Sequence, residues 1–463
     1  MSLPTPEHLR AWLVALESGL LERSLAVRAA LLAALAGEHV LLLGPPGTAK
    51  SELARRLHRA FDGARYFERL LTRFSTPEEL FGPLSLKALE DDRYERLVDG
   101  FLPTAGIAFL DEVFKANSAI LNALLTLLNE REFDNGSGRL RTPLLSVVAA
   151  SNEGPADEAL RAFHDRFLLR VPVTPVGDDH FAALLRLDGA EPRWPLPISP
   201  DERTAVSAAA AQVSLGDEAV QALAALRAWL AAQGRSLSDR RWRQWVGLLR
   251  VAAATEGRRQ IDGLDLWTAP LVAADEPAQA AALAQWFQAD WLQAVPQEAP
   301  WLTRAVEAFE RQLDLEMSAR QDAEADDAAG KLALARQIGM GQGDEGDGML
   351  RIVSQQLEQQ LRRRYSPVHV AARVAQADEL LAQLQAQRAQ AAATADALAA
   401  RLQGRLWWPP ALALQVVDAH RHTEAVLAAL HARLALVREG FATLPLDESL
   451  DEAAPPPVQL EPA

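Results

Sequence analysis

The stretch His39–Ser51, HVLLLGPPGTAKS, decides the fold class of this 463-residue chain. Its apolar run Val40–Leu43 is typical of a strand buried on both faces, and the residues after Ser51 carry leucine and alanine at helical spacing. A strand, a glycine-rich loop ending in Lys-Ser and a helix form the context that a phosphate-binding loop requires. The N–H groups of the loop and the positive end of the helix would surround the phosphates.

Lys50 would then reach the terminal phosphates of ATP, and the Ser51 hydroxyl would ligate Mg²⁺. Ala49 departs from the usual G-x-x-x-x-G-K-[ST] pattern, which has glycine before the lysine. An alanine is tolerated there in right-handed helical dihedrals and strained at positive φ. An ordinary Gly/Pro turn is the alternative interpretation. The predicted nucleotide contacts are Gly44, Pro45, Pro46, Gly47, Thr48, Ala49, Lys50 and Ser51.

A second motif with catalytic side chains in prospect is the run Ile107–Glu112, IAFLDE. Four apolar residues followed by two carboxylates indicate a buried strand that delivers both acids at the carboxyl edge of the sheet, where α/β proteins bind ligands. Asp111 would hold Mg²⁺ together with Ser51, and Glu112 would polarise the water that attacks the γ-phosphate. Taken alone, the same pattern also describes a strand meeting the start of a helix.

Two further polar residues complete the predicted site. Asn152 follows the apolar strand 144–150 and is the candidate that orients the attacking water or the γ-phosphate. Arg166 is the candidate arginine finger, because it lies at a helix–strand corner that could face a neighbouring subunit. Arg161 and Arg170 are alternatives, and each arginine could instead be a surface ion-pair partner.

Composition narrows the class of protein. The chain is 49 % hydrophobic, carries a net charge of −15 and has no cysteine. The acidic balance disfavours a nucleic-acid-binding surface, and the lack of cysteine fits a reducing cytoplasm. We expect no signal peptide and no membrane span, since no uninterrupted apolar run of about 18 residues occurs.

The apolar periodicity predicts four regions. Residues 1–180 would form an α/β nucleotide-binding domain, with two helices within 6–36 and inserted hairpins at 82–103 and 132–142. Residues 181–275 would form an all-helical lid, reached through a proline-rich linker.

The remainder of the chain is helical in pattern. Residues 276–440 predict a helical leg, interrupted by a Gly/acidic loop at about 322–349 and ending in a long antiparallel helix pair joined at Trp407–Pro410. Trp407 and Trp408 could form a packed turn or a docking surface. Residues 441–463 predict a disordered tail.

LLLGPPGTAKS, FLDE, AASNE and FHDRF, in this order, resemble the AAA+ ATPases of the MoxR group. RFSTPEELFGPLSL, ILNALLTLLNERE and SDRRW are similar to the RavA branch of that group. The resemblance covers about the first 270 residues, and the two predicted hairpins match extra elements of this group. The chain departs from that branch in having no β-rich segment between its leg helices, so the branch's decarboxylase docking is not carried over.

The resemblance implies a P-loop AAA+ core with a five-stranded parallel sheet, a hexameric ring and nucleotide bound between subunits. It also implies a second sensor arginine at the start of a lid helix, where Arg240 matches best and Arg241 is the fallback. Proteins of this group typically remodel or mature protein complexes with a partner that contains a von Willebrand factor A (VWA) domain.

Together, the motifs, the composition and the resemblance predict a cytoplasmic Mg²⁺-dependent ATPase that acts on an unknown protein client. Glu112, Asn152 and Arg240 would act within one subunit, and Arg166 would act across the interface. The alternatives are a scaffold that binds ATP without turnover, a metal-chelatase motor subunit and a DNA-directed AAA+ motor.

Overall fold

The computed structural model describes residues 3–136, 138–155, 158–189, 191–319, 363–451 and 453–459. It divides into two compact units, the first formed by residues 1–293 and 401–414 and the second by 294–400 and 415–463. The predicted Gly/acidic loop at 322–349 lies outside the described residues. Within the described part of the chain, no helix is both long and apolar enough to cross a membrane.

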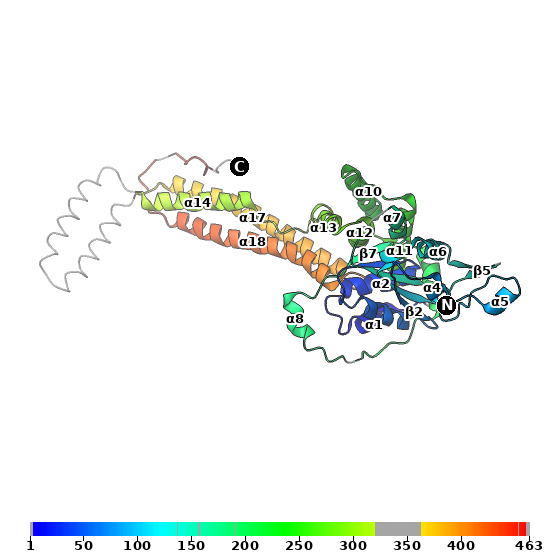
Figure 1. Cartoon of the computed structure of the whole chain (residues 1–463). Helices are drawn as coiled ribbons and strands as arrows, with labels where there is room; N and C mark the ends of the chain where they lie inside the picture. Colours follow the sequence, from blue (N-terminus) through cyan, green and yellow to red (C-terminus); the bar gives the residue numbers. More distant parts are fainter. Residues whose placement is uncertain are drawn as a thin grey trace. The chain divides into compact units, whose positions relative to one another are not determined.

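The first unit, whose residues 1–293 run from blue to green in Figure 1, is built on a five-stranded parallel sheet in the order β2-β3-β6-β1-β7. Its three inner strands are short apolar runs, as a sheet covered on both faces requires, whereas both edge strands include charged residues. The strands are β1 (Val40–Leu43), β2 (Tyr66–Leu70), β3 (Ile107–Asp111), β6 (Ser146–Ser151) and β7 (Leu169–Pro172).

Helices cover both faces of this sheet. On one face, the buried side chains Leu41, Leu110 and Ala149 join a core cluster with Leu124 of α6 and Phe163 of α7. The other face contacts α2 and α3. The helices of this α/β domain are α1 (Pro6–Glu17), α2 (Ser24–Ala36), α3 (Lys50–Leu57), α4 (Pro77–Phe81), α5 (Leu86–Glu90), α6 (Ser118–Glu130) and α7 (Glu158–His164).

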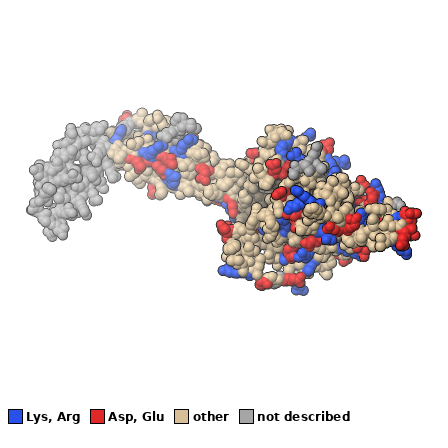
Figure 2. Space-filling model, in the orientation of Figure 1, with Lys and Arg blue, Asp and Glu red and all other residues tan. Residues whose placement is uncertain are grey.

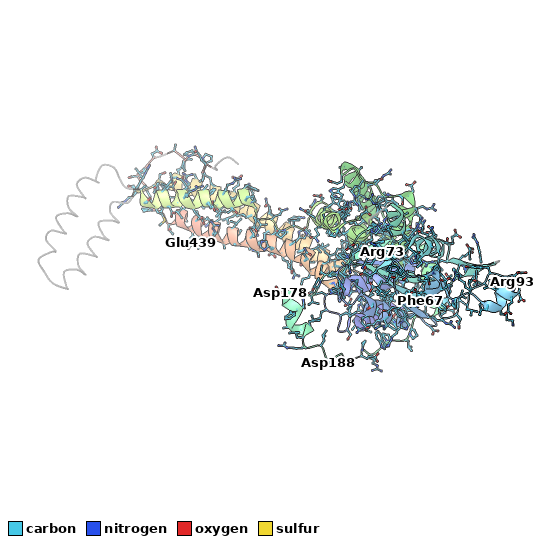
Figure 3. The ribbon with its side chains drawn as sticks, viewed as in Figure 1. Phe67, Arg73, Arg93, Asp178, Asp188 and Glu439 are labelled. Atoms are coloured by element: carbon cyan, nitrogen blue, oxygen red, sulfur yellow. The ribbon has the colours of Figure 1, made fainter. Side chains whose placement is uncertain are left out.

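Both predicted insertions are present. After α4, which begins with the capping box Thr76–Glu79, an antiparallel bridge between Leu84 and Arg96 encloses the short helix α5. β4 (Glu132–Asn135) and β5 (Gly138–Arg141) form the second hairpin. Acidic side chains gather near α5 in Figure 2, where Glu90, Asp91 and Asp92 are exposed, and Figure 3 shows Arg93 at the same tip.

The lid follows a linker that contains α8 (Asp178–Leu184), a short helix with no buried residue. Ser238 caps α11 by accepting from the N–H of Arg241, as the sequence indicates for this helix start. The lid elements are α9 (Pro200–Ala211), β8 (Ser214–Leu215), α10 (Asp217–Ala232), α11 (Asp239–Thr255), β9 (Gln260–Ile261), α12 (Ala269–Ala273) and α13 (Pro277–Trp286).

Residues 401–414 pack against the lid. This packing decides between the two roles considered for Trp407 and Trp408, a packed turn or a docking surface. The indole N–H of Trp407 donates to Thr255 Oγ1 at 2.9 Å, and that of Trp408 donates to the Leu264 carbonyl at 3.1 Å. Arg405 pairs with Asp262 and Asp265 beside them. Both tryptophans are buried, so this turn is a packed element of the lid.

The second unit is a helical bundle of α14 (Pro300–Ser318), α17 (Pro367–Leu402) and α18 (Pro410–Ala442), whose inner faces share one apolar core. The expectation of a disordered tail from residue 441 needs correction. Leu444 is buried, Tyr365 pairs with the backbone of Pro445 and Asp447, and Arg373 donates to the Pro456 carbonyl. These contacts fix the described part of the tail on the bundle.

Candidate functional site

Three strands deliver the predicted site residues to one edge of the sheet. The loop with Lys50 follows β1, Asp111 ends β3 and Asn152 follows β6. β6 lies between β3 and β1, and all three are parallel, so their carboxyl ends meet at this edge. Lys50 is close enough to Asp111 and Glu112 for both carboxylates to influence its pKa.

The phosphate loop is held close to the end of β7. A Cβ atom at Gly44 would lie 1.9 Å from the Val173 carbonyl oxygen, so only glycine fits there. Ala49 has φ 64° and ψ 25°, the left-handed conformation that strains alanine. The methyl group that replaces the usual glycine therefore stores backbone strain immediately before Lys50.

Lys50 lies under this loop with only 7 % of its surface exposed. Its ammonium donates to the carbonyl oxygens of Gly44 and Pro45, both at 2.7 Å. Burial lowers the pKa of Lys50, and the charges of Asp111 and Glu112 oppose that effect. The loop therefore presents a fixed positive charge at the N-terminus of α3, whose first N–H groups no side chain caps.

Glu112 and Asn152 are in direct contact. Asn152 Nδ2 donates to Glu112 Oε1 at 2.8 Å, and Lys115 Nζ lies 3.3 Å from the same oxygen. Glu112 has φ 51°, so the chain turns directly after β3, and the Glu112 N–H donates to Asp111 Oδ1 at 3.0 Å. The amide of Asn152 thus orients the carboxylate that the sequence indicates as the general base.

A cavity of about 460 Å³ adjoins these groups. Its wall includes Glu112 and Asn152 together with the basic side chains of Arg73 and Lys115. Figure 3 shows Arg73 on the body of the first unit, far from the insert tip that carries Arg93. The site therefore offers cationic groups beside Glu112 as well as at the loop that contains Lys50.

The donor set fits a nucleotide with Mg²⁺. Mg²⁺ prefers oxygen ligands and keeps waters or phosphate oxygens in most of its positions, so one hydroxyl and one carboxylate suffice from the protein. Ser51 and Asp111 are such a pair at the edge where the loop ends. Among the described residues, no group of three or more His, Cys, Asp or Glu could hold a metal on its own.

Arg23, which the sequence did not single out, braces the phosphate loop. It is buried, its Nε donates to the Thr48 carbonyl at 3.0 Å, and an Nη donates to the Thr174 carbonyl at 2.7 Å. Arg23 therefore joins the corner before α2 to both the phosphate loop and the segment after β7. The only sequence signal was its place in the break between two helices, near Gly19.

The candidate arginines lie elsewhere. Arg166 precedes β7, and its neighbour Phe167 makes an edge-on ring contact with His39, which precedes β1, so this corner lies at the amino edge of the sheet. The Nε atom of Arg166 is buried without a hydrogen-bond partner among the described residues. Of the alternatives, Arg161 is exposed, whereas Arg170 is buried and bonded to Asp275 and the Ala274 carbonyl.

The structure does not support the expected role of the lid arginines within their own subunit. Arg240 donates to Asn129 at the end of α6, and Gln244, one turn further along α11, bonds to Glu38 just before β1. Arg241 is buried and bonded to the corner before β7. Both arginines therefore lie at the edge of the sheet opposite the phosphate loop.

Comparison with known families gives two matches. Residues 7–196 match the model described as the MoxR domain in the MoxR-vWA-beta-propeller ternary systems. Residues 218–287 match the model of an AAA lid domain. The two matched segments correspond to the α/β domain with its following linker and to the lid.

Curated relatives align over the same part of the chain. "Uncharacterized protein MJ0079" of Methanocaldococcus jannaschii is 43 % identical over 253 residues, which are 54 % of this chain and 66 % of the relative. "Uncharacterized protein MJ0812" of the same organism is 41 % identical over 255 residues, 54 % of this chain and 67 % of the relative. Protein MoxR of Paracoccus denitrificans is 32 % identical over 166 residues, 34 % of this chain and 48 % of that protein. The chain thus spans about two thirds of the length of the first two relatives.

The strain at Ala49 predicts that Ala49→Gly stabilises the α/β domain. Relief of a left-handed alanine is worth about 1 kcal/mol, which would raise the midpoint of thermal unfolding by about 2–4 °C. The matched control is Ala54→Gly in the interior of α3, which should lower the midpoint, because glycine weakens a helix and this methyl group is buried. A lower midpoint for Ala49→Gly would contradict the strain.

The brace by Arg23 predicts that Arg23→Met weakens nucleotide binding. Loss of charged hydrogen bonds to Thr48 and Thr174 removes roughly 1.5–3 kcal/mol of support from the loop, so Kd for ATP should rise about tenfold or more. Fluorescent-nucleotide titration measures this change. Arg10→Met, on the exposed side of α1, is the control and should leave Kd unchanged.

Proposed function

This chain belongs to the MoxR-type AAA+ ATPases, and from that premise we propose that it hydrolyses ATP with Mg²⁺ to remodel or mature a protein complex. The observation that carries the proposal is the convergence at one sheet edge of Lys50, the acid pair Asp111–Glu112 and Asn152. These groups come from three strands, and each has the chemistry that phosphoryl transfer to water requires.

In this proposal the loop and Lys50 bind the phosphates. Lys50 is pre-positioned, because the carbonyl oxygens of Gly44 and Pro45 already hold its ammonium. Mg²⁺, when bound, neutralises charge that develops on the phosphate oxygens, and Ser51 and Asp111 would hold it. Such preorganised charge is effective because it needs no rearrangement during the reaction.

Glu112 acts as the general base toward water. The hydrogen bond from Asn152 fixes the carboxylate, and Lys115 Nζ lies 3.3 Å from the same oxygen. Asn152 therefore acts both on the base and at the position where the attacking water would lie.

Arg166 serves as the arginine finger of a neighbouring subunit. It lies at the amino edge of its own sheet, while the phosphate loop lies at the carboxyl edge, and β7 alone separates the two by about 13 Å at 3.3 Å per residue. This position supports a role for Arg166 in a site other than its own. Arg240, at the same edge, belongs to the same inter-subunit surface. The proposal therefore includes a ring, of which a hexamer is the family's usual form.

The partner and client are proposed from the family alone. The matched MoxR model takes its name from systems with a vWA protein, which supports a VWA-domain partner here. The RavA branch remains the narrower proposal, on the stretches that resemble it. A cytoplasmic location likewise stays a prediction from the cysteine-free composition.

A DNA-directed motor is the competing function of a different class. The net charge is −15, and Figure 2 shows arginine and lysine interspersed with acidic side chains over the visible face of the first unit. Nucleic-acid binding depends on a cluster of basic residues, which this face does not offer. An ATP-binding scaffold and a metal-chelatase motor share the same site, and they differ in turnover and in partner.

Glu112→Gln should bind ATP with nearly unchanged Kd and lose at least a hundredfold in kcat, because general-base catalysis contributes roughly 10²–10⁴-fold. Phosphate release and nucleotide titration measure the two quantities. Lys50→Ala is the matched variant that should lose binding itself. Brisk hydrolysis by Glu112→Gln would reassign the base, and no hydrolysis by the unaltered protein with its partner would favour the scaffold.

Arg166→Ala should keep ATP binding and lose roughly 10³–10⁵-fold in kcat, the usual worth of an arginine finger. Mixing it with Glu112→Gln subunits, which keep Arg166 but cannot hydrolyse, should restore phosphate release in proportion to the mixed interfaces. Arg161→Ala is the control and should retain activity. An absence of restoration would contradict a finger that acts between subunits.

A further inference from the structure

The corner that carries Arg166 is bonded to the lid through Arg241 of α11. The Arg241 side chain is 3 % exposed, and its guanidinium makes five hydrogen bonds. Four of them go to the corner: to the carbonyl and carboxylate of Asp165, both at 3.1 Å, to the Phe167 carbonyl at 3.1 Å and to the Leu168 carbonyl at 2.9 Å. The fifth goes to Val272 of α12 at 2.7 Å, so all five N–H donors are used.

A second set of ion pairs reinforces the same junction. Asp275, directly after α12, accepts from Arg170 at 2.5 Å and lies 3.5 Å from Arg235. Arg170 also lies 3.7 Å from Asp165. Burial lowers the pKa of His164 to about 3, so this ring adds no charge at neutral pH. Asp165 and Asp275 are thus shared among Arg170, Arg235 and Arg241. These ion pairs join the lid to the corner before β7.

The Arg166 side chain takes no part in this network. The bonds from Arg241 reach the residues on either side of it, and its own Nε stays without a hydrogen-bond partner in the described part of the chain. Arg240, the next residue back on α11, bonds to Asn129 and not to the corner. The lid therefore holds the residues on either side of Arg166, and none of these bonds goes to the Arg166 side chain.

We propose that Arg241 is a positioning residue for the arginine finger: it fixes the Asp165–Leu168 corner to the lid, so that a movement of the lid moves Arg166 relative to the neighbouring site. This inference rests on the proposed function, in which Arg166 completes a site on the next subunit. It differs from a sensor role, because a guanidinium with five protein acceptors has no donor left for a phosphate. Lid closure on one nucleotide would then set the hydrolysis rate at the next.

A mixed-subunit assay separates the two roles. Arg166→Ala subunits supply intact sites without a finger, and Glu112→Gln subunits supply a finger from a site that cannot hydrolyse. We expect Glu112→Gln subunits to restore phosphate release, and Glu112→Gln/Arg241→Met subunits to restore at least tenfold less. Glu112→Gln/Arg243→Met is the matched control, since Arg243 is exposed on the same helix, and it should restore fully.

Equal restoration with and without Arg241 would overturn the inference. A reduced restoration cannot come from a role of Arg241 in its own site, because that site is already inactive in Glu112→Gln subunits. Hydrogen–deuterium exchange on the full-length chain gives a second measurement. Peptides covering 161–168 should exchange at least tenfold faster in Arg241→Met than in Arg243→Met, and unchanged exchange would overturn the anchoring.

Arg241→Lys keeps the charge but not the five-donor geometry, and it serves if the methionine variant fails to fold. It should give the same faster exchange in 161–168, and wild-type exchange in this variant would contradict the anchoring. If Glu112→Gln itself restores nothing, the inter-subunit finger is wrong, and the exchange result still decides whether Arg241 anchors the corner.

Discussion

The strand order of one parallel sheet is the constraint on which the site depends. β6 separates β3 from β1, so Asn152 lies between the acid pair and the phosphate loop. Because parallel strands place their carboxyl ends together, residues far apart in sequence meet without any long-range loop having to carry them. The hydrogen bond between Asn152 and Glu112 is the direct result of this pairing.

The opposite edge of the sheet has a different chemistry. There the buried charges are arginines with carbonyl and carboxylate acceptors, and burial lowers the pKa of Arg170 to about 9, so that it remains charged at neutral pH. Asp275 and the Ala274 carbonyl accept from Nη1 of Arg170 and compensate part of the cost of burying this charge, although its Nε has no hydrogen-bond partner among the described residues. The fold thus separates the residues that we propose to bind phosphate from those that join the lid to the Asp165–Leu168 corner.

Much of this arrangement follows from local sequence. The strand before Gly44, the Lys-Ser pair and the acids after Phe109 each have a short-range signature, because backbone geometry and side-chain chemistry act within a few residues of one another. The capping box at Thr76 and the two hairpins are equally local. The resemblance to the MoxR group implied the five-stranded sheet, and the structure contains it.

The remaining features depend on contacts between distant segments. Arg23 lies 25 residues from its acceptor Thr48 and 151 from Thr174, and no local pattern encodes such pairs. Arg240 and Arg241 look alike in sequence, yet only Arg241 falls in phase with the buried Trp245 and Leu248 of α11. Helical phase therefore carried a signal for its burial, although the acceptors that hold it come from the corner before β7.

The packing of Trp407 and Trp408 against the lid makes that domain discontinuous along the polypeptide. Its helices are complete by Trp286, but residues 401–414, which contact Thr255 and Leu264, come much later in the chain. During synthesis at roughly 5–20 residues per second, the ribosome must add the intervening bundle helices before these residues emerge. The nascent lid therefore exposes the surface around Thr255 and Leu264 for several seconds, an interval in which non-native association is a hazard and a chaperone can bind.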